Sequence, residues 1–216
     1  MLAHFFSGGV MRTRVKICGF TRKDDALAAA ALGVDAMGLV FYPPSPRNIG
    51  VEVAADIVSA LPAFVSVVGL FVDAEPDWIR TVQAKVRIDC LQFHGDEAPE
   101  QCRMYDRAYI KAIRMQPGTD LARIQSGYGD AAGLLLDAWH PGVQGGTGSR
   151  FDWDLIPNDL TLPLILAGGL TADNAEHAVR SVRPYALDVS SGVEVAKGIK
   201  SPAKMAEFIR KTNQTL

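Results

Sequence analysis

Short apolar runs alternate with helical patterns along the chain. Eight such runs of four to six residues have the length and composition of parallel strands that are buried on both faces. They are Val15–Cys18, Ala36–Phe41, Ser66–Phe71, Cys90–Phe93, Tyr109–Ile113, Gly133–Leu136, Leu164–Ala167 and Ala186–Val189.

Helical patterns fill the intervals between these runs, and several begin with proline, which the first turn of a helix tolerates. They are Asp24–Leu32, Val53–Leu61, Pro76–Val86, Pro99–Asp106, Leu121–Ser126, Trp153–Ile156, Ala172–Val182 and Pro202–Lys211. Eight strand–helix units predict a single-domain (β/α)8 TIM barrel over residues 13–216, with residues 1–12 as a tail without function. A doubly wound open sheet is the alternative, but the first turn carries no phosphate-binding fingerprint.

Composition narrows the class of protein. The chain has 216 residues, 48% of them hydrophobic, which suits one domain with a substantial core. Its net charge of -2 and mixed charge pattern predict no nucleic-acid partner and no membrane-surface partner. No apolar run is long enough to span a bilayer. The three cysteines, Cys18, Cys90 and Cys102, form no C-x-x-C pair, which favours a reducing, cytoplasmic compartment.

The carboxyl ends of the strands form the active site of a (β/α)8 barrel. Cys18 ends the first strand and Asp137 ends the sixth, so the two could act as base and acid. A thiol base needs a lowered pKa, and the charge of Lys16 on the same strand face could supply it, unless Lys16 pairs with Asp188 instead. Asp137 needs a raised pKa to act as an acid, or it could simply cap the next turn. A lone strand cysteine is also more often a core residue than a catalytic one.

Two glycine-rich loops follow the last two strands, where this fold usually binds phosphate. Their backbone N–H groups and serine hydroxyls can approach an anion closely. Two ordinary tight turns are the alternative interpretation. The candidate phosphate-binding residues are Gly168, Gly169, Ser190, Ser191 and Gly192.

Two further side chains are candidate substrate-binding residues. Arg47, in a proline-rich loop, could grip a carboxylate with its guanidinium fork, or it could be a solvated side chain. His94, after the fourth strand, could contact a ligand or shape a turn. The acidic residues Asp24, Asp25 and Glu97 are expected to be solvated at helix starts.

Taken in order, several segments together resemble the phosphoribosylanthranilate isomerase family, enzymes of tryptophan biosynthesis. They are Val15-Lys16-Ile17-Cys18-Gly19, Ser45-Pro46-Arg47, Gln92-Phe93-His94-Gly95, Leu136-Asp137, Gly145-Gly146-Thr147-Gly148 with Phe151-Asp152-Trp153, Leu166-Ala167-Gly168-Gly169-Leu170, and Asp188-Val189-Ser190-Ser191-Gly192-Val193-Glu194.

The resemblance implies an Amadori rearrangement of N-(5-phosphoribosyl)anthranilate to 1-(2-carboxyphenylamino)-1-deoxyribulose 5-phosphate. It implies that Asp137 protonates the furanose ring oxygen and that Cys18 removes the proton from sugar C2. It also implies that no metal or other cofactor is needed, because the iminium formed on ring opening is the electron sink. A monomer and a homodimer both remain open.

Three other functions fit the sequence less well. The related aminoimidazole isomerase of histidine biosynthesis resembles a longer chain with duplicated halves and an aspartate at the position of Cys18. A pentose-phosphate epimerase needs metal-binding residues at several strand ends, where this chain offers only His94. A non-catalytic phosphate-binding barrel requires neither the thiol nor the carboxylate.

Overall fold

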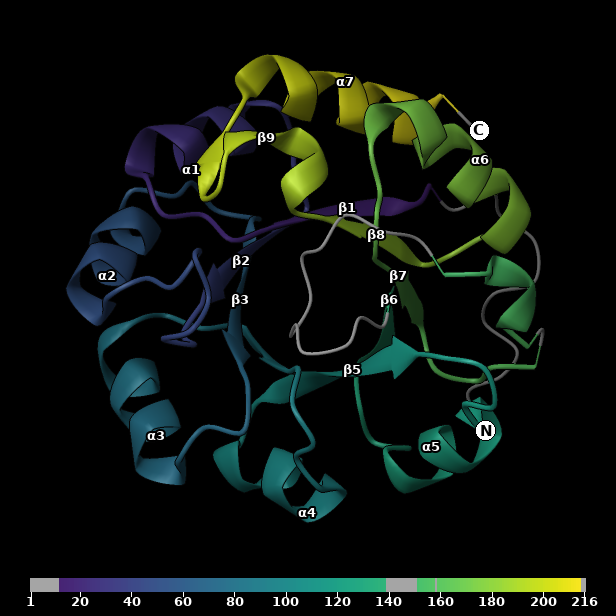
Figure 1. Ribbon diagram of the computed structural model, residues 1–216. Coiled ribbons are helices and arrows are strands. Elements are labelled where there is room, and N and C mark those ends of the chain that lie inside the picture. Colours follow the sequence, from purple (N-terminus) through teal and green to yellow (C-terminus); the bar gives the residue numbers. More distant parts are fainter. Residues whose placement is uncertain (1–11, 139–150, 158, 215–216) are drawn as a thin grey trace.

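Eight parallel strands close into a barrel in the order β1-β2-β3-β4-β5-β6-β7-β8, and helices surround it (Figure 1). The computed structural model describes residues 12–138, 151–157 and 159–214. The strands are β1 Arg14–Cys18, β2 Ala36–Val40, β3 Ser66–Phe71, β4 Cys90–Phe93, β5 Ala108–Met115, β6 Gly133–Ala138, β7 Leu164–Leu166 and β8 Ala186–Val189. The predicted (β/α)8 barrel is therefore confirmed.

The helices follow the strands as predicted, with small shifts at their ends. They are α1 Lys23–Ala31, α2 Val51–Ser59, α3 Pro76–Lys85, α4 Pro99–Cys102, α5 Leu121–Gly127, α6 Ala172–Val182 and α7 Pro202–Asn213, with short 3-10 helices η1 Arg103–Tyr105, η2 Trp153–Leu155 and η3 Ser191–Val193. The helix predicted over Pro99–Asp106 is present to Tyr105 but is not one continuous α-helix. It divides into α4 and η1, and Asp106 ends η1 in the left-handed region at φ 47°.

Two strands extend beyond the carboxyl ends of their predicted apolar runs. In β5 and β6, the pairs Arg114–Asp137 and Met115–Ala138 continue the ladder to the barrel rim. The antiparallel hairpin of β9 Glu194–Ala196 and β10 Ile199–Lys200 was not predicted at all. This hairpin follows β8 and lies beside α1 (Figure 1).

Side chains alternate between two cores along the strands. Outward-facing residues such as Ile17, Leu39 and Leu91 are fully buried between the barrel and its helices. A smaller cluster fills the barrel interior, formed by Ile110, Ala112, Leu135, Ile165, Ala167 and Ala186. Because Leu135 faces the interior, Asp137 two residues later faces it too, at the carboxyl end of β6.

Some predictions lie outside the described residues, namely the tail residues 1–11 and the motif Gly145-Gly146-Thr147-Gly148 within 139–150. Arg12, predicted to belong to the tail, pairs with Asp35. Within the described ranges, no helix is long and apolar enough to cross a membrane.

Candidate active site

Cys18 is the last residue of β1, and its side chain is buried at the barrel rim. In the β1–β2 ladder it pairs with Gly38, where an added Cβ would lie 2.6 Å from the Cys18 Sγ atom. Gly38 therefore leaves the space that the thiol occupies.

Lys16 and Asp188 meet inside the barrel below the thiol. They are partners in the β1–β8 register, and their Nζ and Oδ2 atoms are 2.8 Å apart. Both side chains are buried. The predicted alternative, a buried pair with Asp188, is thus present, while Lys16 also remains close enough to Cys18 to act on its charge.

Burial raises the pKa of the Cys18 thiol, and the Asp188 carboxylate raises it further. The charges of Lys16 and of Lys200 act in the opposite direction but do not overcome burial. The lowered thiol pKa that the sequence interpretation required is therefore absent in the free protein.

Asp137 lies beside His94, which projects from the carboxyl end of β4. The His94 Nε2 and Asp137 Oδ2 atoms are 3.3 Å apart, and the other ring nitrogen of His94 is 3.0 Å from the side-chain amide of Gln92. All three side chains are buried. Asp137 also accepts a hydrogen bond from the backbone N–H of Ala138, the last residue of β6, at 2.8 Å. The turn that Asp137 could cap lies outside the described residues.

The two glycine-rich loops pack against each other. Gly168 and Gly169 have φ values of 84° and 62°, a region that favours glycine. A Cβ at Gly168 would lie 3.0 Å from Asp137 Oδ1, and one at Gly192 would lie 1.9 Å from the carbonyl oxygen of Leu170. The loops thus adjoin each other and the carboxylate of Asp137.

The Ser190 hydroxyl donates to the carbonyl oxygen of Cys18 at 3.0 Å. This bond joins the loop after β8 to the end of β1. Ser191 and Gly192 follow in η3. The backbone N–H groups of Gly168, Gly169 and Ser190 donate to no described residue.

Arg47 binds the carboxylate of Glu194 in the β9–β10 hairpin. Its Nε and Nη2 groups donate to Glu194 Oε1 and Oε2 at 2.9 and 2.8 Å. Arg47 is buried, so the alternative of a solvated side chain is wrong. Its Nη1 group forms no hydrogen bond with any described residue.

Two acidic residues expected to be solvated are buried instead. Glu97 pairs with Lys111 at 2.8 Å and accepts backbone hydrogen bonds from Gly95 and Asp73. Asp25 accepts from the backbone N–H of Lys200. Both carboxylates hold loops at the barrel rim, which explains why they are buried where most charged residues are not.

The sequence interpretation missed Lys200 altogether. Its ammonium group contacts Cys18, Ser190 and Glu194 and is completely buried. The only local signal is one polar residue in a short extended run after Gly198, which does not distinguish a buried lysine from a solvated one.

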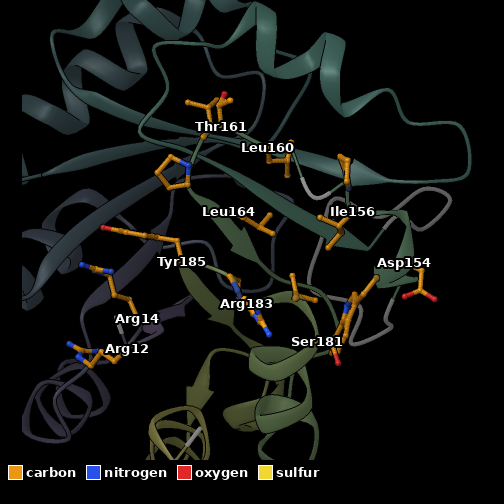
Figure 2. Close-up of a pocket in the computed structure, with 16 residues that line it drawn as sticks. Arg12, Arg14, Asp154, Ile156, Leu160, Thr161, Leu164, Ser181, Arg183 and Tyr185 are labelled. Atoms are coloured by element: carbon orange, nitrogen blue, oxygen red, sulfur yellow. The ribbon is translucent and has the colours of Figure 1, made fainter. Parts of the chain in front are cut away.

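A separate pocket of about 690 Å³ lies at the opposite end of the barrel (Figure 2). Its wall includes Arg14, Leu164 and Tyr185, which stand at the amino-terminal starts of β1, β7 and β8. Catalytic residues of this fold lie at the other ends of the strands. The pocket is therefore not the predicted active site.

Comparisons with known proteins agree with this geometry. The family model described as N-(5'phosphoribosyl)anthranilate (PRA) isomerase matches residues 15–211. The N-(5'-phosphoribosyl)anthranilate isomerase of Nitrosococcus oceani is 57% identical over 200 residues, covering 93% of this chain and 97% of the relative.

Solved structures of phosphoribosyl anthranilate isomerases are also similar to this chain. The phosphoribosyl anthranilate isomerase of Thermotoga maritima has a TM-score of 0.86 and 40% identity, covering 94% of this chain and 99% of the other. Another structure of such an isomerase is a complex with reduced 1-(o-carboxyphenylamino)-1-deoxyribulose 5-phosphate. It has a TM-score of 0.83 and 39% identity, with coverage of 94% and 99%.

Proposed function

The chain belongs to the N-(5'-phosphoribosyl)anthranilate isomerase family of tryptophan biosynthesis, and we propose that Asp137 and Cys18 are the acid and base of its reaction. The reaction is the Amadori rearrangement of N-(5-phosphoribosyl)anthranilate to 1-(2-carboxyphenylamino)-1-deoxyribulose 5-phosphate. The assignment rests on one observation. The Cys18 thiol lies at the carboxyl end of β1 and the Asp137 carboxylate at the carboxyl end of β6, so both are buried at the same rim of the barrel.

Asp137 donates a proton to the furanose ring oxygen, and the ring opens to an iminium. Cys18, as thiolate, then removes the proton from C2, and the resulting enolamine tautomerises to the ketone. The iminium accepts the electron pair of the broken C–H bond, so the proposal includes no metal and no redox cofactor. Holding both ends of the substrate would keep C2 close to the thiolate.

The substrate's two anionic ends have candidate partners on the same rim. The phosphate is proposed to bind the loops of Gly168, Gly169, Ser190, Ser191 and Gly192, where three backbone N–H groups have no acceptor among the described residues. The anthranilate carboxylate is proposed to meet Arg47, through the Nη1 group that Glu194 does not use. His94 is proposed to support Asp137 and to border the bound sugar.

In this proposal the catalytic unit is the barrel of residues 13–216, and residues 1–12 have no part in the chemistry. We also propose that the enzyme acts in the cytoplasm. The low cysteine content and the free thiols of Cys18, Cys90 and Cys102 support a reducing compartment.

An assay with freshly made phosphoribosylanthranilate tests the activity, followed by the change in anthranilate fluorescence. A folded wild-type protein that binds phosphate but gives no turnover would reject the enzymatic function in favour of a non-catalytic barrel. Turnover of the histidine-pathway aminoimidazole substrate alone would favour the rival isomerase.

Single variants test the residue assignments. Cys18→Ser and Asp137→Asn are expected to lose about 10²- to 10⁴-fold in kcat while substrate still binds, because each removes one proton-transfer group. Cys90→Ser, at the start of β4, and the exposed Asp77→Asn are matched controls that keep their activity. A near-wild-type rate in either test variant removes that residue from the mechanism.

A further inference from the structure

Lys200 is the most deeply buried cation of the rim, and the proposed reaction gives it no role. It is the second residue of β10, and the exposed fraction of its side chain is 0%. Its backbone N–H donates to Asp25 of α1 at 2.9 Å, which ties the hairpin beside that helix (Figure 1). A buried lysine is costly unless its charge is compensated, so its contacts indicate what it does.

The three protons of the Lys200 ammonium group all have acceptors within the protein. They are the Cys18 carbonyl oxygen at 2.5 Å, Glu194 Oε1 at 2.8 Å and the Ser190 carbonyl oxygen at 3.2 Å. No proton remains for a phosphate or a carboxylate of the substrate. Lys200 is therefore suited to hold the protein together rather than to bind substrate.

These contacts join the parts of the site that come from distant segments. The carbonyl of Cys18 receives both Lys200 and the Ser190 hydroxyl, so the end of β1 is fixed against the loop after β8. Glu194 connects the same ammonium group to the guanidinium of Arg47. One buried cation thus connects three parts of the proposed site. It binds the backbone of Cys18 and the β8 loop directly, and it is linked to Arg47 through Glu194.

The charged groups around the Cys18 thiol come from four elements. Lys16 on β1 and Asp188 on β8 lie below it, Lys200 lies on β10, and Arg47 lies in the loop after β2. Asp188 opposes ionisation of the thiol, whereas Lys16 and Lys200 favour it. Each lysine is itself paired with a carboxylate at 2.8 Å, Lys16 with Asp188 and Lys200 with Glu194. Glu194 is shared with Arg47, so the cluster around Lys200 keeps a second cation.

We propose that Lys200 is a positioning residue for Cys18, fixing the Cys18 peptide against the β8 loop and holding a positive charge beside the proposed base. The inference rests on the proposed role of Cys18 as the base. It goes beyond that role by naming Lys200 as the residue that keeps Cys18 in position. Lys200 touches no reacting atom. Its effect is expected on kcat and on the pH at which Cys18 ionises, with little effect on KM.

The test compares the full-length wild type with Lys200→Met and Lys200→Gln. Both variants remove the charge, and the glutamine keeps a donor for the Cys18 carbonyl, so it covers the case in which the methionine variant does not fold. Lys204→Met is the matched control, because exposed Lys204 donates to the backbone oxygen of Glu194 at 2.8 Å and does not contact Cys18. Two readouts are measured across pH: kcat/KM, and the rate at which iodoacetamide modifies Cys18, located by peptide mass spectrometry.

In both Lys200 variants, kcat/KM is expected to rise at a higher pH than in the wild type. The pH at which the alkylation rate of Cys18 rises is expected to increase in the same way. A shift of one pH unit lowers the alkylation rate at a fixed pH about tenfold. Lys204→Met should follow the wild type. A uniform loss of activity at all pH values with unchanged alkylation, or a rise in KM alone, would overturn the inference. Neither result would affect the proposed function, which is tested separately by wild-type turnover of phosphoribosylanthranilate and by the Cys18 and Asp137 variants.

Discussion

Lys16 and Asp188 face each other across the seam between the first and last strands, with Nζ and Oδ2 2.8 Å apart. The pair is buried within the barrel, directly beneath Cys18 in the β1 side-chain alternation. This ion pair joins β1 to β8, the first and last strands of the barrel, where the barrel closes. It also sets two opposing charges beside the proposed base.

Lys16→Met is expected to lower the free energy of unfolding by about 3–5 kcal/mol, because Asp188 would stay buried without its cation. The same change is expected to raise the pKa of the Cys18 thiol further, since the Lys16 charge favours the thiolate. Urea unfolding and the pH dependence of Cys18 alkylation measure the two effects. The double variant Lys16→Met/Asp188→Leu should regain much of the stability. An unchanged thiol titration in Lys16→Met would end the idea that Lys16 assists the base.

Stability in acid is expected to depend on Glu194. Burial opposes ionisation of this carboxyl, but Arg47 and Lys200 outweigh burial and lower its pKa below 4.5. A lowered pKa stabilises the folded state above the unfolded value, and this stabilisation is lost as the pH falls through the folded value. The stability difference between the wild type and Glu194→Gln should therefore shrink as the pH falls below 4.5. Urea unfolding of both proteins across this range measures it, and a constant difference would contradict the prediction.

Gly192→Ala is expected to disturb the proposed phosphate site, because the new Cβ would lie 1.9 Å from the backbone oxygen of Leu170. Backbone must move to relieve this contact, and the loops after β7 and β8 separate. We expect KM to rise at least about tenfold, or about 1.4 kcal/mol of binding free energy. Steady-state kinetics measure this. Gly50→Ala is the control, since its Cβ would meet nothing within 4 Å. Equal KM values in the two variants would argue against a phosphate site at Gly192.

His94→Asn is expected to lower kcat by about tenfold to a hundredfold if His94 supports Asp137 as proposed, because the imidazole 3.3 Å from Asp137 Oδ2 is lost. His94→Gln, which can place an amide near the former Nε2 position, should recover part of this loss. Measurement of kcat and KM separates support for Asp137 from direct contact with substrate. A rise in KM with kcat unchanged would show that His94 contacts substrate instead.

The alternation of apolar runs and helical segments was sufficient to determine the barrel. Parallel strands buried on both faces are mostly apolar, so each strand is visible locally, and β3, β4 and β8 have the predicted bounds. The strand ends then identified Cys18 and Asp137 as rim residues, because the fold places all carboxyl ends at one face. The local pattern did not show that the helical segment after β4 changes from α4 to the 3-10 helix η1 at Arg103.

Only the tertiary structure decided how the rim is held together. Lys200 and Cys18 are 182 positions apart in the chain, and Arg47 and Glu194 are 147 apart, so no local pattern records either contact. Glu97 and Asp25 were expected in solvent because acidic residues usually are, yet each is buried by partners from other segments. Local periodicity in the sequence thus determined which strand-end residues lie at the site. Closure of the barrel decided which charges neutralise one another there.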